Sequence, residues 1–485
     1  MSAGRDEGSR HINRFAYVVV AVAACAACSS APTGTTRPPA DSVAMWLTTA
    51  DQAQLLTPQA SLRFDATAPA APYFIELDTT RRYQTIVGFG AAFTDAATYL
   101  VQEKLSASQR QALLADLFSP TQGIGISFMR LTMASSDLSR SHWSYDDMPA
   151  GQRDSALAHF SIEKDREAML PVVLQARQLN PALVIVASPW SPPGWMKTSG
   201  SMIGGSLRPD ACASLAGYFL RFLQAYDSAG VPVQYVTIQN EPAYEPPDYP
   251  GMYMPAADRA AFIGRNLGPL LQQNRMPTKI LDWDHNWETG APLGVLGDAT
   301  ANPFVAGVAW HCYSGTITAQ TAVHDLLPSK EAFLTECSGG SWQGGGFGGA
   351  LGAMTDLVIE GTRNWARGVA YWSLALDPDN GPHTGGCGTC RGVVTIDPAT
   401  GAVTRNADYY ALAHASRFVR PGAARIESNS DTGGLRDVAF ANPDGSKVLV
   451  VWNGASAERV FAVRVGTYWF GSTLPAGAVA TYGWH

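Results

Sequence analysis

The sequence carries little charge, and what charge it has is not concentrated. Charged residues make up 15% of the 485 residues, the formal net charge is −7, and the 34 lysine and arginine residues are scattered along the chain. Proteins that bind nucleic acid or an anionic membrane surface gather positive charge into patches or stripes. We therefore expect no nucleic-acid partner, and the composition favours an uncharged substrate.

The apolar run near the N-terminus is too short to cross a membrane. Phe15–Ala24 has about half the length of a bilayer span and follows three arginines, which is the pattern of a secretory signal peptide. We predict that 1–28 is such a signal, that 29–42 is a Ser/Thr/Pro-rich tether, and that the protein is exported. Cys25 fits a bacterial lipobox, with Cys28 as a second candidate. Secretion, a periplasmic location and lipid anchoring to the cell envelope all stay open.

Cysteine is scarce, and five of the seven cysteines lie beyond the signal segment. Because five is an odd number, at least one of them has no intramolecular partner. Cys387 and Cys390 form a CxxC that could supply half of a zinc site, but no second CxxC follows, and His383 alone does not complete the ligand set. An exported protein meets an oxidising environment, so we expect a local disulfide between these two cysteines.

Aromatic residues, in contrast, are plentiful, with 13 tryptophans and 17 tyrosines. The apolar face of a sugar ring can stack on such side chains, and this composition is compatible with carbohydrate binding. Large protein cores hold tryptophan as well, so no single tryptophan indicates a sugar site.

Eight short runs rich in β-branched and aromatic residues alternate with longer amphipathic segments, which is typical of repeated βα units. Eight such units can close into a (β/α)8 TIM barrel, and we predict an α/β fold with this barrel over residues 83–418. The short runs at 43–82 and 419–485 lack helical spacing and are expected to form an attached β-sandwich. The eight barrel strands are expected at 84–93, 125–133, 183–190, 234–239, 279–284, 305–313, 332–336 and 368–376.

Polar and aromatic side chains gather at the ends of these predicted strands. A barrel enzyme builds its active site from the C-terminal ends of its strands and the loops that follow them. A role as a helix cap or a loop residue explains any single member, and is the better explanation for Asp282, Asp284 and His285, but it explains the whole set poorly. The strand-end residues are Asp95, Arg130, Trp190, Asn240, Glu241, Asp282, Asp284, His285, His311, Tyr313, Glu336 and Trp372.

Two of the strand-end carboxyl groups suit the hydrolysis of a glycosidic bond, which normally requires one acid and one nucleophile or base. Glu241 follows Asn240 after the fourth predicted strand, and Glu336 ends the seventh, so we expect them to face each other across the barrel mouth. Arg130 can keep Glu336 ionised, as a nucleophile requires, whereas an acid/base needs a higher pKa. Spacing in the sequence does not distinguish a retaining from an inverting pair.

These motifs resemble glycoside hydrolase family 30, which includes lysosomal glucosylceramidase and β-1,6-glucanases. The resemblance runs from about Tyr83 to the C-terminus, and it implies a retaining mechanism on a (β/α)8 barrel with an attached β-sandwich. It also implies that Glu241 is the acid/base and Glu336 the nucleophile. The matching segments are 88–95 (GFGAAFTD), 130–137 (RLTMASSD), 187–195 (ASPWSPPGW), 240–242 (NEP), 311–313 (HCY), 335–337 (TEC) and 371–376 (YWSLAL).

The resemblance further implies which side chains surround the two glutamates. No metal or organic cofactor is implied, and the expected substrate carries a β-glucosyl linkage, as in a β-glucoside, β-1,6-glucan or glucosylceramide, with the ceramide ranked last. The chain departs from the lysosomal enzyme at His383, where that enzyme has an asparagine. The expected substrate-binding residues are Asp95, Trp190, Asn240, Tyr313, Trp372 and His383, with Arg130 and His311 in supporting roles.

Three alternatives stay open from the sequence. A non-catalytic surface protein on a degenerate barrel would bind carbohydrate, although binding alone does not need two strand-end glutamates. A β-xylosidase of the same family is a second possibility. The third is a metal-dependent hydrolase that uses Asp282, Asp284, His285 and His311, which a chelator would inactivate.

Overall fold

The computed structural model describes residues 42–485. The predicted signal segment and the lipidation candidates Cys25 and Cys28 lie outside the described residues, and so does nearly all of the predicted tether. Within 42–485, no helix combines the length and the apolar character needed to cross a bilayer.

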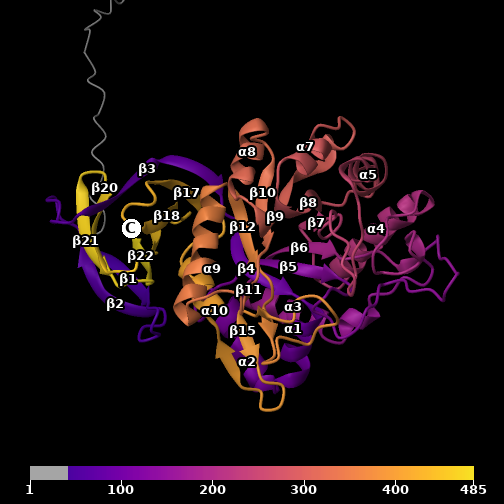
Figure 1. Ribbon diagram of the computed structural model, residues 1–485, viewed down its shortest axis with the longest axis horizontal. Helices are drawn as coiled ribbons and strands as arrows, with labels where there is room; N and C mark the ends of the chain where they lie inside the picture. Colours follow the sequence, from indigo (N-terminus) through magenta and orange to yellow (C-terminus); the bar gives the residue numbers. More distant parts are fainter. Residues whose placement is uncertain (1–41) are drawn as a thin grey trace, which may run out of the picture. The chain divides into compact units, whose positions relative to one another are not determined.

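Eight parallel strands close into a barrel in the order β10-β12-β4-β5-β6-β7-β8-β9 (Figure 1). Each of the eight runs predicted from the sequence supplies one of these strands, and the predicted barrel is confirmed. β4 and β5 are buried along their whole length, as expected for parallel strands covered on both faces. The barrel strands are β4 (Gly88–Phe93), β5 (Phe128–Met133), β6 (Val184–Pro189), β7 (Tyr235–Thr237), β8 (Lys279–Trp287), β9 (Val305–Gly315), β10 (Glu331–Glu336) and β12 (Ala366–Tyr371).

The helices around the barrel follow the predicted amphipathic segments. α2 begins after a capping box in which Ser106 accepts from the Gln109 backbone N–H and Gln109 reaches back to the Ser106 backbone N–H. A π-helical turn at Ile263–Leu267 divides the helical segment between Ala256 and Gln273 into α5 and α6. The α-helices are α1 (Asp95–Tyr99), α2 (Ala107–Phe118), α3 (Met169–Leu179), α4 (Cys212–Ser228), α5 (Ala256–Phe262), α6 (Gly268–Gln273), α7 (Gly290–Leu296), α8 (Thr318–Leu326), α9 (Gly346–Arg363) and α10 (Ala407–Ser416).

A second, nine-stranded sheet forms the β-sandwich and draws its strands from both ends of the described chain. β1 pairs with β22, and β3 lies between β17 and β20. The two edges of the sheet meet where Asp65 and Trp469 exchange backbone hydrogen bonds of 2.8 Å. The strands are β1 (Ser42–Thr48), β2 (Thr57–Arg63), β3 (Tyr73–Thr85), β17 (Ala424–Ser428), β18 (Leu435–Ala441), β19 (Lys447–Asn453), β20 (Arg459–Val465), β21 (Tyr468–Leu474) and β22 (Val479–Trp484).

Helix α9 joins the sandwich to the barrel. Its last residue, Arg363, donates to the Ser428 carbonyl at 2.6 Å and to the Asp437 carbonyl at 2.9 Å. Gly352 on the same helix lies against the Trp452 ring, where a side chain would collide with the indole. In Figure 1, α9 lies between the barrel and the sandwich sheet.

Two disulfides and two small sheets shape the loops beyond the barrel strands. The predicted Cys387–Cys390 disulfide is confirmed, and a second disulfide joins Cys312 to Cys337. Among the described cysteines, only Cys212 is free. The short strands of the small sheets are β11 (Gly339–Gly340) paired with β14 (Cys390–Arg391), and β13 (Ala375–Leu376) paired with β15 (Val394–Ile396), which also pairs with β16 (Val403–Arg405).

Candidate active site

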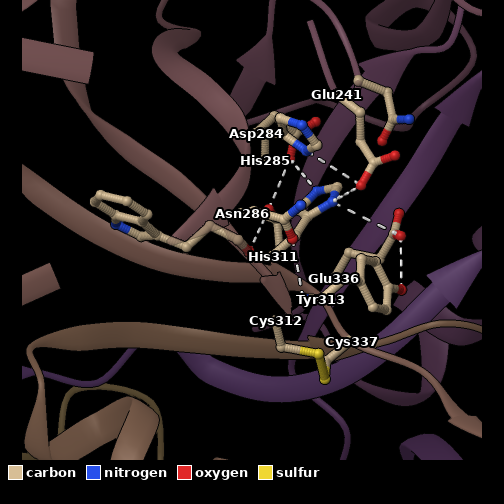
Figure 2. Close-up of polar contacts among 12 residues, drawn as sticks. Glu241, Asp284, His285, Asn286, His311, Cys312, Tyr313, Glu336 and Cys337 are labelled. Carbon is tan, nitrogen blue, oxygen red and sulfur yellow. Dashed lines mark hydrogen bonds and ion pairs between the residues drawn. A yellow bond between two sulfur atoms is a disulfide. The ribbon is translucent and has the colours of Figure 1, made fainter. Parts of the chain in front are cut away.

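A cavity of about 460 Å³ lies over the barrel mouth, and its volume is within the usual range for small-molecule sites. Glu241, which follows β7, and Glu336, which ends β10, both line it. The two glutamates therefore face one cavity, as the strand-end argument predicts. Trp372 lies in its wall, and Figure 2 shows the polar contacts around the two carboxyl groups.

Arg130 on β5 is completely buried and connects three strand ends. Its Nη1 forms an ion pair with Glu336, and its Nη2 donates to Asn240 Oδ1 and to Asp284 Oδ2, each at 2.7 Å. Burial alone would lower the pKa of the guanidinium, but the charges of Asp284 and Glu336 raise it. Arg130 is therefore a permanent positive charge directly beside Glu336.

The buried cation should also be needed for folding. Replacing Arg130 with methionine leaves Asp284 as a buried charge without its main cationic partner, and such a loss costs about 3–5 kcal/mol. We expect the free energy of unfolding, measured by urea titration, to fall by this amount. Arg166→Met is the matched control because Arg166 forms an exposed ion pair with Glu163, and it should change stability by less than about 1 kcal/mol. Equal effects of the two substitutions would contradict the structural role of Arg130.

Asp284, which lies inside β8, is the buried anion under the site. It accepts hydrogen bonds from Ser188 at 2.5 Å and from Thr237 and Thr335 at 2.7 Å, in addition to those from Arg130 and His311. Burial alone would raise the pKa of Asp284, but the positive charges and these donors hold it well below its ordinary value.

A bulge in β8 separates Asp284 from Asp282. The register of β8 shifts between Trp283 and His285, and Trp283 and Asp284 have positive φ values of 77° and 51°. The shift changes the alternation of side chains, because two residues on a bulged strand oppose one on the partner. Asp282 consequently pairs with Arg259 at 2.8 Å on helix α5, away from the cavity.

His311 on β9 lies between the two glutamates (Figure 2). Its Nδ1 is 3.1 Å from Glu241 Oε1 and 3.7 Å from Glu336 Oε1, and its Nε2 is 3.0 Å from Asp284 Oδ1. Burial alone would lower the pKa of His311, but the charge of Glu336 and the hydrogen bond to Asp284 raise it to about 9. Both ring nitrogens of the imidazolium then donate to carboxylates.

The raised pKa of His311 links the stability of the protein to pH. Its folded value of about 9 exceeds the ordinary value of 6.5, so its protonation stabilises the fold fully below pH 6.5, and this contribution disappears as the pH rises through 9. We expect the urea midpoint of the wild-type protein to decline between pH 6.5 and 9, and the decline to be shallower in His311→Gln. His159→Gln, at an exposed site, should keep the wild-type slope. An unchanged slope in His311→Gln would show that this proton is not coupled to folding.

Glu241 follows β7 with a φ of 46°, a conformation that non-glycine residues rarely adopt. Its backbone N–H donates to the Asp284 carbonyl at 3.0 Å, which fixes this turn. Burial alone would raise the pKa of Glu241, but the neighbouring His285 and His311 imidazoles lower it to about 2. The sequence argument expected a raised pKa for this residue, and the structure gives the opposite, because the proton shared by the Glu241 carboxyl group and the His311 imidazole rests on the histidine.

Glu336 is held from both sides. Tyr313 donates its hydroxyl to Glu336 Oε1 at 2.8 Å, while Arg130 contacts the other carboxylate oxygen. The disulfide Cys312–Cys337 joins the residue before Tyr313 to the residue after Glu336, so it fixes the two strand ends to each other. Glu336 is thus oriented by one cation and one neutral donor.

Four of the ten residues predicted for the site line the cavity, namely Glu241, Tyr313, Glu336 and Trp372. Arg130, Asn240 and His311 belong to the hydrogen-bond network that holds the two glutamates, and the other three predicted residues do not line the cavity. Trp190 is buried beneath Trp372, with ring centroids 4.9 Å apart. Asp95 is bound by Arg140, which donates to both carboxylate oxygens at 2.8 and 2.9 Å. His383 is exposed on its loop, with Nδ1 3.1 Å from the Gly385 carbonyl.

The structure adds cavity residues that the sequence argument did not include. Asp137 is buried and lines the cavity, and burial together with the charge of Glu336 raises its pKa to about 7. It lies four residues beyond the end of β5, inside one of the segments that carry the family resemblance, so the segment was noticed but its acidic residue was not. Tyr244, Tyr249 and Trp342 come from loops that have no periodic signal in the sequence.

The residues proposed for a metal-dependent hydrolase do not all lie together at the site. The donor atoms of Glu241, His285 and His311 lie within 4.8 Å of one another, a spacing that a cation could use. The same atoms face one another at hydrogen-bonding distances of 3.1 and 3.3 Å. Asp282 is occupied by Arg259 outside the cavity, so the four residues of the metal hypothesis do not form one cluster.

Two carboxyl groups that face one cavity from opposite strand ends of a (β/α)8 barrel are characteristic of glycosidases. Comparison with known families agrees with this class. Residues 86–419 match the glycosyl hydrolase family 30 TIM-barrel domain, and residues 422–482 match the family 30 beta sandwich domain. The chain belongs to glycosyl hydrolase family 30 and is a glycosidase.

Individual relatives cover most of the chain. An endo-1,6-β-D-glucanase of Neurospora crassa is 37% identical over 409 residues, which are 80% of this chain and 83% of that protein. The lysosomal acid glucosylceramidase of Mus musculus is 32% identical and covers 84% of this chain and 83% of its own. Among solved structures, an endo-β1,6-glucanase superposes with a TM-score of 0.84 at 31% identity, covering 91% of this chain and 99% of its own.

Proposed function

We propose that this glycosidase cleaves β-1,6-linked glucan by double displacement, with Glu336 as the nucleophile and Glu241 as the general acid/base. One observation carries the assignment of the two roles. Both carboxyl groups contact the same nitrogen of His311, but only Glu336 is paired with a permanent cation, Arg130. The two carboxyl groups are therefore close enough to act on one bond. Their different charged partners, Arg130 for Glu336 and histidine for Glu241, suit them to different roles.

The shared contact favours the retaining geometry. Retaining pairs stand about 5–5.5 Å apart and inverting pairs about 6.5–9.5 Å. Glu241 Oε1 and Glu336 Oε1 lie 3.1 and 3.7 Å from His311 Nδ1. The two oxygens would be separated by the inverting distance only if His311 Nδ1 lay almost on the line between them. In that case the histidine would occupy the space that an inverting enzyme needs for a water molecule.

The first step uses the ionised Glu336. Its carboxylate attacks the anomeric carbon of the glucosyl unit, and the bond from that carbon to the leaving oxygen breaks. Arg130 stabilises the charged form of Glu336, and the Tyr313 hydroxyl orients it. The product of this step is a glycosyl ester on Glu336, in which the nucleophile carries no charge.

Glu241 handles the proton in both steps. The proton that it shares with His311 passes from the Glu241 carboxyl group to the leaving oxygen as the bond breaks. In the second step Glu241 takes a proton from water, which attacks the anomeric carbon and releases Glu336. Because two displacements occur on the same carbon, the product keeps the β configuration.

Other side chains are placed to hold the sugar. Trp372 offers a ring in the cavity wall, and Asp137 offers a buried carboxyl group that can accept hydrogen bonds from sugar hydroxyls. Asn240 is fixed by Arg130 through its Oδ1, so its amide N–H groups are directed away from that contact. These three residues are the substrate-binding set that we propose.

The choice of β-1,6-glucan is supported by the relatives. Fungal proteins named endo-1,6-β-D-glucanase are 35–37% identical to this chain, whereas proteins named glucosylceramidase are 30–32% identical. Export is supported by the two disulfides within the described residues, because such bonds persist in oxidising compartments. Lipid attachment at Cys25 stays a further proposal, and mass spectrometry of the mature protein tests it.

The proposed function predicts both the substrate and the stereochemistry. We expect β-1,6-linked gluco-oligosaccharides to be hydrolysed with a higher kcat/KM than glucosylceramide or aryl β-xylosides. Proton NMR during the first minutes of hydrolysis should show the β-anomer of the new reducing end before mutarotation. An α-anomer as the first product would overturn the double displacement, and a preference for glucosylceramide would overturn the proposed substrate.

A further inference from the structure

Besides Tyr313, which donates to Glu336, two exposed aromatic side chains lie at the mouth of the catalytic cavity. Trp342 is 54% exposed and Tyr244 is 45% exposed, and both line the cavity that also contains Glu241 and Glu336. A single aromatic ring in water is ordinary on a protein surface. Two such rings beside one catalytic pair form a surface on which a ligand can stack.

The turn that carries Trp342 is built to hold the ring in place. Gln343 Oε1 accepts from the Gly340 backbone N–H at 3.3 Å and from Arg391 Nη2 at 2.6 Å, and the Gln343 backbone N–H donates to the Gly340 carbonyl at 3.1 Å. Arg391 is in turn ion-paired with Asp408 on α10, which is buried. Through Gln343 and Arg391, the turn is thus connected to helix α10.

Gly340 provides the space that the indole occupies. A Cβ at this position would overlap the Trp342 ring, so the ring lies directly over the glycine backbone. Gly340 pairs with Cys390 in the small β11–β14 sheet, and Cys390 is linked to Cys387 by a disulfide. The position of Trp342 therefore depends on the absence of a side chain at Gly340.

Tyr244 comes from the loop that carries the acid/base. Its backbone N–H donates to the Glu241 carbonyl at 2.9 Å, which closes a tight turn. Tyr244 and Trp342 are exposed at the rim of the cavity, whereas Trp372 and Asp137, which we assign to the attacked sugar, are buried, so the two rings lie where a leaving group extends toward solvent. Trp342 lies six residues beyond Glu336, and the two rings thus border the cavity from the loops of both glutamates.

We propose that Trp342 and Tyr244 form a binding subsite for the glycosyl residue on the leaving-group side of the scissile bond. This inference rests on the proposed function of Glu241 and Glu336. It specifies the substrate further, because the enzyme recognises a sugar in the leaving group and not only the glucosyl unit that is attacked.

The chemistry of the mouth favours a sugar over a lipid chain. Aromatic faces suit the C–H surface of a pyranose, whereas a ceramide needs a continuous aliphatic surface. Within 42–485, none of the exposed large aliphatic side chains lines the cavity, and its exposed large apolar residues are all aromatic. The exposed aliphatic residues are Leu55, Leu326, Val403 and Val460.

The subsite is tested by two substrates that differ only in the leaving group. β-Glucosyl fluoride has no sugar there, whereas gentiotriose, a β-1,6-linked trisaccharide, does. The loss of one aromatic contact should lower the ratio of kcat/KM for gentiotriose to kcat/KM for glucosyl fluoride by up to about tenfold in Trp342→Ala. Phe74→Ala removes a ring of similar exposure from β3 in the sandwich, and it should leave this ratio as in the wild type.

A second variant tests the position of the ring without removing it. Gly340→Ala should displace the indole and lower the same ratio, and the double variant with Trp342→Ala should be no worse than Trp342→Ala alone. A wild-type ratio in Trp342→Ala, with both substrates cleaved, would overturn the subsite and leave the proposed function intact. Hydrolysis of neither substrate by the wild type would overturn the proposed function and the subsite with it. A larger loss on glucosylceramide than on gentiotriose would assign the mouth to lipid.

Discussion

Replacing Glu336 with glutamine is expected to reduce kcat on a β-glucoside by more than about 10,000-fold. Glutamine keeps the shape of the side chain but cannot form the glycosyl ester. The neutral amide also removes one of the two anions paired with Arg130, while Asp284 remains, so the protein should still fold. The measurement is initial-rate kinetics, accompanied by circular dichroism of the purified variant.

The control for this variant lies on the same strand. Glu331→Gln changes a glutamate at the start of β10, which pairs with Lys279 and Arg367 outside the cavity, and it should retain activity. Azide is expected to rescue Glu336→Ala in part and to give the α-glucosyl azide, because it attacks the anomeric carbon from the side left open. Wild-type activity in a folded Glu336→Gln protein would refute its role as nucleophile.

Replacing Glu241 with alanine is expected to have an effect that depends on the leaving group. Loss of a general acid costs about 100- to 10,000-fold when the leaving oxygen needs a proton. Gentiotriose should therefore lose most of its kcat, whereas a dinitrophenyl β-glucoside, whose leaving group departs as a stable anion, should keep its first step and be slowed in the second. Steady-state kinetics with the two substrates separate these effects.

Azide also distinguishes the role of Glu241 from that of Glu336. In Glu241→Ala it should attack the glycosyl ester and give the β-glucosyl azide, the opposite anomer to that from Glu336→Ala. Glu245→Ala in the same loop removes an exposed carboxyl group that accepts from the Gly205 backbone N–H, and it should behave as the wild type. Equal losses on both leaving groups in Glu241→Ala would contradict its role as general acid.

The barrel was predictable because its strands are local features of the sequence. Each of the eight runs combines β-branched and aromatic residues with a polar or aromatic residue at its end, and such a run forms a buried parallel strand wherever it lies in the chain. The position of Glu241 and Glu336 at one mouth follows from this count alone. The β-sandwich was predictable for the same reason, since its C-terminal strands alternate with glycine- and asparagine-rich turns.

The parts that escaped prediction depend on contacts between distant segments. Asp284 resembles a helix cap in the sequence, and only the bulge after Trp283 turns it under the site, where it meets Arg130 and His311. The Cys312–Cys337 disulfide requires the neighbouring ends of β9 and β10. Cavity residues such as Trp342 lie in loops whose course is set by glycines and by pairing with other loops.

The nine-stranded sheet imposes an order on the folding of the chain during synthesis. β1 and β3 leave the ribosome first, but their partners β22, β17 and β20 are among the last segments to appear. Except for the closing pair β12–β4, the barrel strands between them pair with near neighbours in the sequence, and they can assemble before β17, β20 and β22 are synthesised. Until then one edge of β1 and both edges of β3 lack a partner strand. Deletion of β22 would therefore leave β1 without one of its two partner strands, so a truncation at the C-terminal end of the described chain would destabilise the sheet at its N-terminal end.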